Sequence, residues 1–104
     1  MLFLTYWELS ENMPVHQTLE IAKKLTSSGL FPPKGVKILR WDETPDNWGI
    51  LLAEADSAMD VDLALATWRM AGAGFFRLTK TAPAVPIAEG MQAWEERLKA
   101  VTSL

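Results

Sequence analysis

The charged residues that could do chemistry in this sequence are those placed inside apolar stretches. Glu54 follows the run Ile-Leu-Leu-Ala, and Lys37 and Arg40 lie within the run Val-Lys-Ile-Leu-Arg-Trp. A buried carboxyl group without a partner has a raised pKa and can act as a general acid or base. A Lys37–Glu54 pair, or an Arg–Glu pair, would instead fix the register of a dimer. That structural role is the simpler interpretation, and Glu54 and Arg40 are kept beside it as candidate catalytic residues.

The aromatic residues are the second group that could form a site. Five tryptophans are many for 104 residues, and large aromatic side chains usually fill cores or interfaces. They could also line an apolar pocket, either between a sheet and its helices or inside a dimeric barrel. The candidate ligand-binding residues are Tyr6, Trp41, Trp48 and Trp68, and Trp7 belongs to the same aromatic group.

Other kinds of site lack the residues that they require. His16 is the only histidine, and His16 with Glu20 supplies too few ligands for a metal site. The segment from Asp42 to Asn47 lacks the glycine turn and the terminal Glu of a calcium loop, whereas its residue types suit a solvated turn. The chain has no cysteine, which excludes disulfides, thiol catalysis and thiolate ligands. We therefore predict neither a metal nor a cofactor.

The net charge and the hydropathy of the chain limit which binding partners and which cellular location we expect. The net charge is −3 and no basic run is longer than Lys23-Lys24, so neither nucleic acid nor a membrane surface is an expected partner. No stretch approaches the roughly 18 apolar residues of a membrane-spanning helix. The apolar start has no basic region before it, which favours a strand over a signal peptide. A cytoplasmic location is the expectation, in keeping with the absence of cysteine.

Seven secondary-structure elements must position these candidates. Segments rich in β-forming residues predict strands, and apolar stripes with helical spacing between cap residues predict helices. The expected strands are Leu2–Leu9, Val36–Trp41, Trp48–Ala55 and Phe75–Ala82, and the expected helices are Pro14–Ser28, Ser57–Ala71 and Ile87–Val101. The order β-α-β-β-α-β predicts a ferredoxin-like α+β domain, with a four-stranded antiparallel sheet in the order 4-1-3-2 and two helices on one face. We predict one domain over residues 1–104, in which residues 86–104 form a C-terminal helical extension.

The central hairpin predicts a sheet that is apolar on both faces. If its turn spans residues 42–47, Trp41 lies opposite Trp48 and shares a face with Ile50, while Leu51 points to the helices. The face with the tryptophans is too apolar for water and indicates an interface. The simplest cover is a second copy of the same sheet, so we predict a homodimer formed through the sheet face. A bulge or a one-residue shift would exchange the faces, and both would still be apolar.

The helix that starts at Ser57 has the same excess of apolar surface. One stripe contains Val61, Leu65 and Trp68, and a second stripe lies about 180° away at 100° per residue. The second stripe comprises Met59, Leu63, Ala66 and Met70. The C-terminal helix, from the same chain or from the partner, is the expected cover.

Several strings resemble a family of small bacterial proteins of unknown function. They are LTSSGLFPPKGVKILRW, then Gly49, AEADSAMDVDLALATW and LTKTAPAV, and the likeness extends over residues 1–86. The resemblance implies the dimeric α+β barrel superfamily, whose members include binders of aromatic or haem-like ligands and metal-free oxygenases that use Asn and Trp. Asn47 beside Trp48 resembles the Asn and Trp that those oxygenases use. Asp42 stands where the family often has a histidine, which makes Asp42 a third candidate catalytic residue and puts any activity that depends on the histidine in doubt.

The predicted function is a homodimeric small-molecule-binding or interaction module, because no acid–base or nucleophile constellation can be assembled. A serine triad fails for want of a suitable histidine. The alternative is a cofactor-independent isomerase or monooxygenase that acts on an apolar or aromatic substrate, with Glu54 or Arg40 polarising it.

Overall fold

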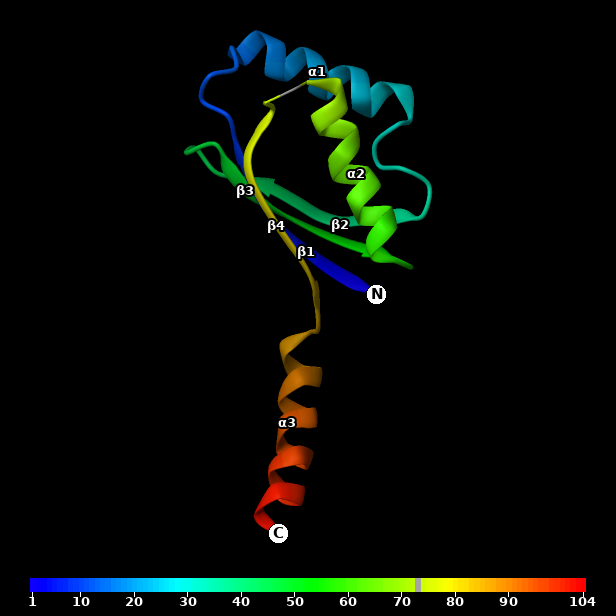
Figure 1. The fold of residues 1–104 in the computed structure, drawn as a ribbon, viewed down its shortest axis with the longest axis vertical. Helices are drawn as coiled ribbons and strands as arrows, with labels where there is room; N and C mark the ends of the chain where they lie inside the picture. The colour runs from blue at the N-terminus through cyan, green and yellow to red at the C-terminus, as the bar shows by residue number, and fades with distance from the viewer. Residues whose placement is uncertain (73) are drawn as a thin grey trace.

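The computed structural model describes residues 1–72 and 74–104, and all of the predicted helices and strands are present in it. The strands are β1 (Leu2–Leu9), β2 (Val36–Glu43), β3 (Trp48–Ala55) and β4 (Phe76–Ala84), and the helices are α1 (Val15–Ser28), α2 (Ala58–Ala71) and α3 (Ile87–Thr102). Figure 1 shows α1 and α2 on one side of the sheet and α3 as a separate arm beyond the end of β4. Within the described residues, no helix has the length and hydropathy needed to cross a membrane.

The four strands form one antiparallel sheet in the order β2-β3-β1-β4. From the opposite edge this order is 4-1-3-2, so the predicted topology is confirmed. Helices α1 and α2 cover one face, which we call the helix face, and we call the other the open face. The chain therefore has the ferredoxin-like α+β fold.

The side chains of β1 alternate between these two faces. Phe3, Thr5 and Trp7 are buried on the helix face, whereas Leu4 between them points to the open face and is exposed. The buried Thr5 hydroxyl lies 2.9 Å from the hydroxyl of Thr81 on β4. The polar group in this part of the core is thus hydrogen-bonded, as buried polar groups generally are.

Helix α2 packs one apolar stripe onto the helix face. Val61, Leu65 and Trp68 are buried, as their spacing predicts. The Ser57 side chain accepts a hydrogen bond from the backbone N–H of Asp60 at 3.3 Å and so caps the helix. The second stripe, in contrast, stays exposed or half-buried: Met59, Leu63, Ala66 and Met70.

The turn between β2 and β3 is shorter than predicted. Strand β2 continues to Glu43, so the turn comprises only residues 44–47. The backbone N–H and the hydroxyl of Thr44 both donate to the carbonyl oxygen of Trp48, at 2.8 and 3.0 Å. Asn47 adopts a φ of 61°, a conformation that asparagine tolerates better than most residues. Four residues therefore suffice for the turn, and the acidic residues before it join the strand.

A bulge between Ile38 and Arg40 then decides which side chains of β2 reach the helix face. Beyond the bulge, Trp41 lies opposite Leu51, which is buried under the helices. The predicted pairing of Trp41 with Trp48 is therefore wrong, as is the expected position of Trp41 on the open face. Arg40 takes that position because neighbouring residues of a strand point to opposite faces.

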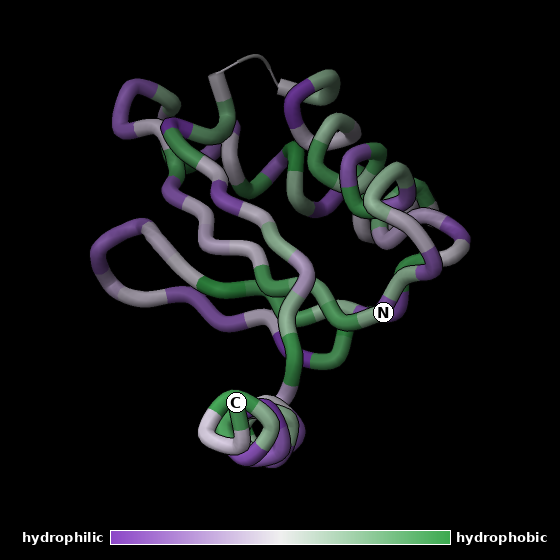
Figure 2. The backbone as a smooth tube through the Cα atoms, turned by 60° about the horizontal axis from the view of Figure 1, so that its bottom comes forward, coloured by the Kyte–Doolittle hydropathy of each residue, from purple (hydrophilic) through white to green (hydrophobic). Residues whose placement is uncertain are grey.

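Helix α3 stands apart from the rest of the chain. None of its residues, all of which the structure describes, is buried. Only Val85 and Pro86 separate it from β4, a link too short to bring the helix back over α2. Figure 2 shows α3 nearly along its axis, with hydrophobic and hydrophilic residues on different sides. The expectation that α3 covers the second stripe of α2 within one chain is thus wrong.

Candidate functional site

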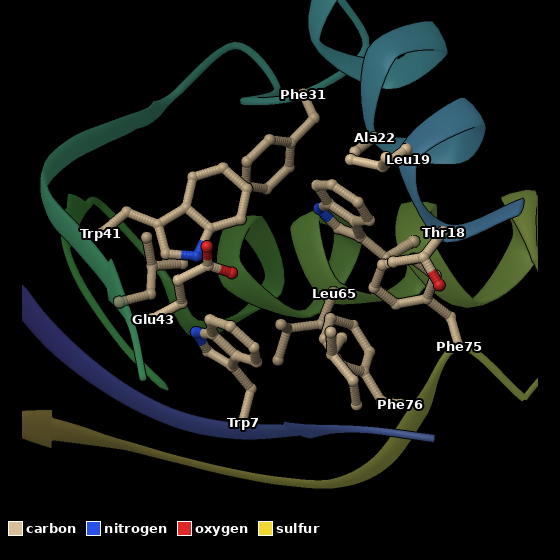
Figure 3. A pocket seen from close by; sticks show the side chains of 13 residues that line it. Trp7, Thr18, Leu19, Ala22, Phe31, Trp41, Glu43, Leu65, Phe75 and Phe76 are labelled. Carbon is tan, nitrogen blue, oxygen red and sulfur yellow. The ribbon is translucent and has the colours of Figure 1, made fainter. Parts of the chain in front are cut away.

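A partly enclosed cavity of about 250 Å³ lies between the helix face of the sheet and helices α1 and α2. Six of its lining residues are aromatic: Trp7, Phe31, Trp41, Trp68, Phe75 and Phe76. Figure 3 shows the rings of Trp7, Phe31, Trp41, Phe75 and Phe76 around the cavity. The other apolar lining residues are Leu9 of β1, Leu19 and Ala22 of α1, Leu51 of β3 and Leu65 of α2. Protein interiors normally close-pack, so unfilled space of this size in a small core indicates room for a ligand.

Trp68 is the centre of the aromatic wall. Its ring centroid lies 5.1 Å from that of Phe31, 5.7 Å from that of Trp41 and 5.0 Å from that of Phe75. Phe31 and Trp41 are themselves 5.2 Å apart, and these contacts are edge-to-face except for the tilted pair with Phe75. Edge-to-face packing is favourable for aromatic rings. Rings from α2, β2 and the segment after α1 therefore hold one another in place around the cavity.

Trp7 supplies the buried polar group of the site. The residue is 7 % exposed, and its indole Nε1 is buried without a hydrogen-bond partner. Trp7 pairs with Gly49 of β3, where a Cβ would lie 2.4 Å from Cζ2 and 2.8 Å from Cε2 of the indole. Cε2 is the ring carbon bonded to Nε1. The absence of a side chain at Gly49 thus lets the indole lie over β3 with its nitrogen-bearing edge toward β2.

Glu43 of β2 faces that edge of the indole. Glu43 pairs with Gly49 from the other side, so Trp7, Gly49 and Glu43 form one row across three strands. In Figure 3 the Glu43 carboxylate and the indole nitrogens of Trp7 and Trp41 lie at the same end of the cavity. The side chain of Glu43 remains exposed, and it does not accept a hydrogen bond from Trp7. One end of an apolar cavity therefore combines a buried N–H donor with a carboxylate acceptor.

Two of the four predicted ligand-binding aromatics line this cavity. Trp41 and Trp68 are part of its wall. Tyr6 and Trp48 lie on the open face instead, with ring centroids 5.6 Å apart. The structure thus divides the predicted set into two pairs on opposite faces of the sheet.

The three candidate catalytic residues lie on the open face, away from the cavity. Arg40 and Asp42 form an exposed ion pair, since alternate residues of a strand share a face. Glu54 is exposed and lies opposite Lys37 in the β2–β3 register. In the part of the chain that the structure describes, no ion pair joins these two side chains. The catalytic roles stay predictions, and the cavity would act without these three residues.

Other charged groups also lie outside the cavity. His16 is exposed on α1. Arg77 donates a hydrogen bond to Glu8 at 2.8 Å, and this contact raises the pKa of Arg77 above its ordinary value. Among the residues described, no group of three or more His, Cys, Asp or Glu side chains is placed to hold a metal ion.

Sequence reasoning missed Glu43 and the phenylalanines of the wall. Glu43 falls within the segment predicted as a turn. The signal that identifies it is the alternation from Trp41 to Glu43, which continues the strand by one period. Phe31, Phe75 and Phe76 lie in loops or at the end of a strand, where periodicity carries little information.

A comparison with solved structures supports the ferredoxin-like fold. No protein-family model matches the sequence, and no curated protein matches it. A dimeric protein of unknown function and ferredoxin-like fold from Bacteroides fragilis superposes with a TM-score of 0.51 at 15% identity, over 78% of this chain and 90% of that chain. An antibiotic biosynthesis monooxygenase superposes with a TM-score of 0.49 at 15% identity, over 83% of this chain and 100% of that chain. Fold and site together define a ferredoxin-like α+β protein with an aromatic cavity under its helices.

Proposed function

We propose that the protein is a homodimer whose protomers each bind a small, largely apolar molecule in the aromatic cavity. The observation that carries this proposal is the unfilled space of about 250 Å³ bounded by aromatic rings. An apolar cavity of about 150 Å³ is enough to bind benzene, so this one would accept a molecule of about two fused rings. A ligand would supply the dispersion contacts that rings facing empty space lack.

The open face supports the dimer. Leu4, Ile50 and Leu78, from three neighbouring strands, are each about two-fifths exposed, and Tyr6 and Trp48 add aromatic surface among them. Within the described chain, α1 and α2 lie on the other face and leave these side chains uncovered. An apolar patch of this kind usually marks an interface, and a second sheet of the same shape is its simplest cover. The Bacteroides fragilis protein, which shares the fold, is described as dimeric.

The C-terminal arm supports the same assembly. The apolar residues of α3 recur at alternating intervals of four and three, which is the spacing of a helix–helix seam. They are Ile87, Met91, Trp94, Leu98 and Val101. Trp94 is 80% exposed, and the short link after β4 keeps α3 from returning to its own helices. We propose that this seam packs on the second protomer.

Calorimetric titration with naphthalene tests the ligand proposal. We expect one naphthalene to bind per protomer. The Ala22→Leu variant adds volume to the cavity wall and should lose binding, with an unchanged circular dichroism spectrum. Ala66→Leu, on the outer side of α2, is the matched control and should bind as the wild type does. Equal binding by the Ala22→Leu variant would contradict the cavity as the site.

Sedimentation equilibrium tests the dimer. The wild type should be dimeric at micromolar concentration. Ile50→Glu places a carboxylate in the apolar centre of the open face and should give a monomer. Val15→Glu, at an exposed position of α1, is the control and should leave the dimer intact. A monomeric wild type, or a dimer that Ile50→Glu does not weaken, would overturn assembly through the sheet.

A further inference from the structure

The polar end of the cavity holds a donor and an acceptor that are not bonded to each other. The indole Nε1 of Trp7 can only donate, and an ionised Glu43 carboxylate can only accept. The indole nitrogen is buried without a partner, a state that native structures seldom keep. Both residues pair with Gly49, and the Trp7 indole occupies the place that a side chain at Gly49 would take. A ligand group placed between the indole nitrogen and the carboxylate would have one donor on one side and one acceptor on the other.

We propose that this end of the cavity recognises a hydroxyl group, so that the ligand is a hydroxylated aromatic molecule. The hydroxyl oxygen accepts from Trp7 Nε1, and the hydroxyl hydrogen is donated to Glu43. A hydroxyl group can make both bonds at once. A carbonyl oxygen would face the Glu43 carboxylate as a second acceptor, and an ammonium group would leave Trp7 without an acceptor. This inference rests on the proposed function, because it names the class of molecule that the same cavity binds.

The rest of the cavity requires the remainder of the ligand to be apolar and flat. The rings of Phe31, Trp41 and Trp68 present faces and edges that suit another aromatic ring. Away from the Glu43 end, Thr18 carries the one hydroxyl group of the lining, and this hydroxyl donates to the carbonyl of Pro14 at 3.4 Å, at the start of the same helix. One polar substituent, at the Glu43 end, therefore matches the site.

A matched pair of ligands tests the proposal. Naphthalene and 2-naphthol share their rings and differ by one hydroxyl group. We expect calorimetry to show 2-naphthol binding about tenfold more tightly, the gain expected from hydrogen bonds of which one involves a charged group. Equal affinities would overturn the hydroxyl proposal and leave the proposed function standing. Binding of neither molecule would overturn both.

Substitutions at the polar end of the cavity test which residues cause the preference for 2-naphthol over naphthalene. Trp7→Phe removes the donor and Glu43→Leu removes the acceptor, while both keep apolar bulk in the wall. Each should abolish most of the preference for 2-naphthol, measured as the ratio of the dissociation constants of naphthalene and 2-naphthol for the same variant. Asp42→Leu, at the adjacent position on the open face, is the matched control and should keep the full preference. A preference that survives both Trp7→Phe and Glu43→Leu would overturn the assignment.

Nuclear magnetic resonance of the wild type gives a readout that does not depend on any variant folding. Each of the five tryptophans contributes one indole N–H signal in a ¹⁵N-labelled sample. Both ligands should shift the Trp7 signal through the ring currents of their naphthalene rings, and we expect 2-naphthol to shift it further downfield, because a new hydrogen bond adds to that shift. A Trp7 signal that responds equally to the two ligands would overturn the proposal.

Discussion

Gly49 holds open the polar end of the cavity, and its replacement by alanine should destabilise the protein. A Cβ at this position would lie 2.0 Å from the carbonyl oxygen of Asp42 and 2.4 Å from Cζ2 of Trp7. The indole could avoid the new methyl group only by leaving the core that buries it. The Asp42 oxygen belongs to the backbone of β2, so the strand itself would have to move. Steric conflict therefore arises on both sides of Gly49.

The expected loss of stability follows from the close packing of Asp42 and Trp7 against Gly49. Overpacking a core usually costs about 1–3 kcal/mol, and a backbone obstacle places Gly49→Ala at the upper end, about 3 kcal/mol. With a urea m-value of roughly 2 kcal/mol per M, the midpoint of unfolding should fall by about 1.5 M. Urea unfolding followed by circular dichroism measures this change. The protein concentration must be held fixed, because the apparent stability of a dimer depends on it.

Gly90→Ala is the matched control for this experiment. Gly90 lies inside α3, and a Cβ there would have one neighbour, Val85, at 3.8 Å. Alanine in a helix interior is more favourable than glycine, so this variant should be neutral or up to about 1 kcal/mol more stable. If Gly49→Ala unfolds within about 0.5 kcal/mol of the wild type, the close packing of Trp7 on Gly49 is refuted. The geometry assigned to the polar end of the cavity would then fail with it.

Four further changes test separate parts of the structure. Trp68→Ala removes the centre of the aromatic wall and should lower the free energy of unfolding by about 3–5 kcal/mol in urea; a loss below about 1 kcal/mol would contradict its central position. Thr5→Val leaves the Thr81 hydroxyl without its buried partner and should cost about 1 kcal/mol in the same assay, and adding Thr81→Val should cost little more. Ser57→Ala removes the cap of α2 and should cost about 1 kcal/mol, seen as a lower thermal midpoint; an unchanged midpoint would show that the cap is dispensable. Trp94→Ala should leave the circular dichroism spectrum unchanged and weaken the dimer in sedimentation experiments, whereas undiminished dimerisation would contradict the packing of α3 on the second protomer.

The amino-acid sequence by itself determines the order of the elements and much of the core. Its β-forming and aromatic residues identify the strand Leu2–Leu9. Ser57 identifies the start of α2, and helical spacing places Trp68 on its buried stripe. Each of these features depends on residues a few positions apart in the chain, so local physical chemistry is enough to decide it.

Only the tertiary structure decides which side chains form the cavity. The residues between Trp41 and the next strand suit a turn of six residues as well as one of four, and both registers leave an apolar face on each side. The bulge after Ile38 and the shorter turn place Trp41 on the helix face, where its ring packs against Phe31 and Trp68. The same change places Glu43 in the row that contains Gly49 and the buried indole of Trp7. Those contacts join segments that are distant in sequence, so their energy enters only when the helices meet the sheet, and no local pattern can reveal it.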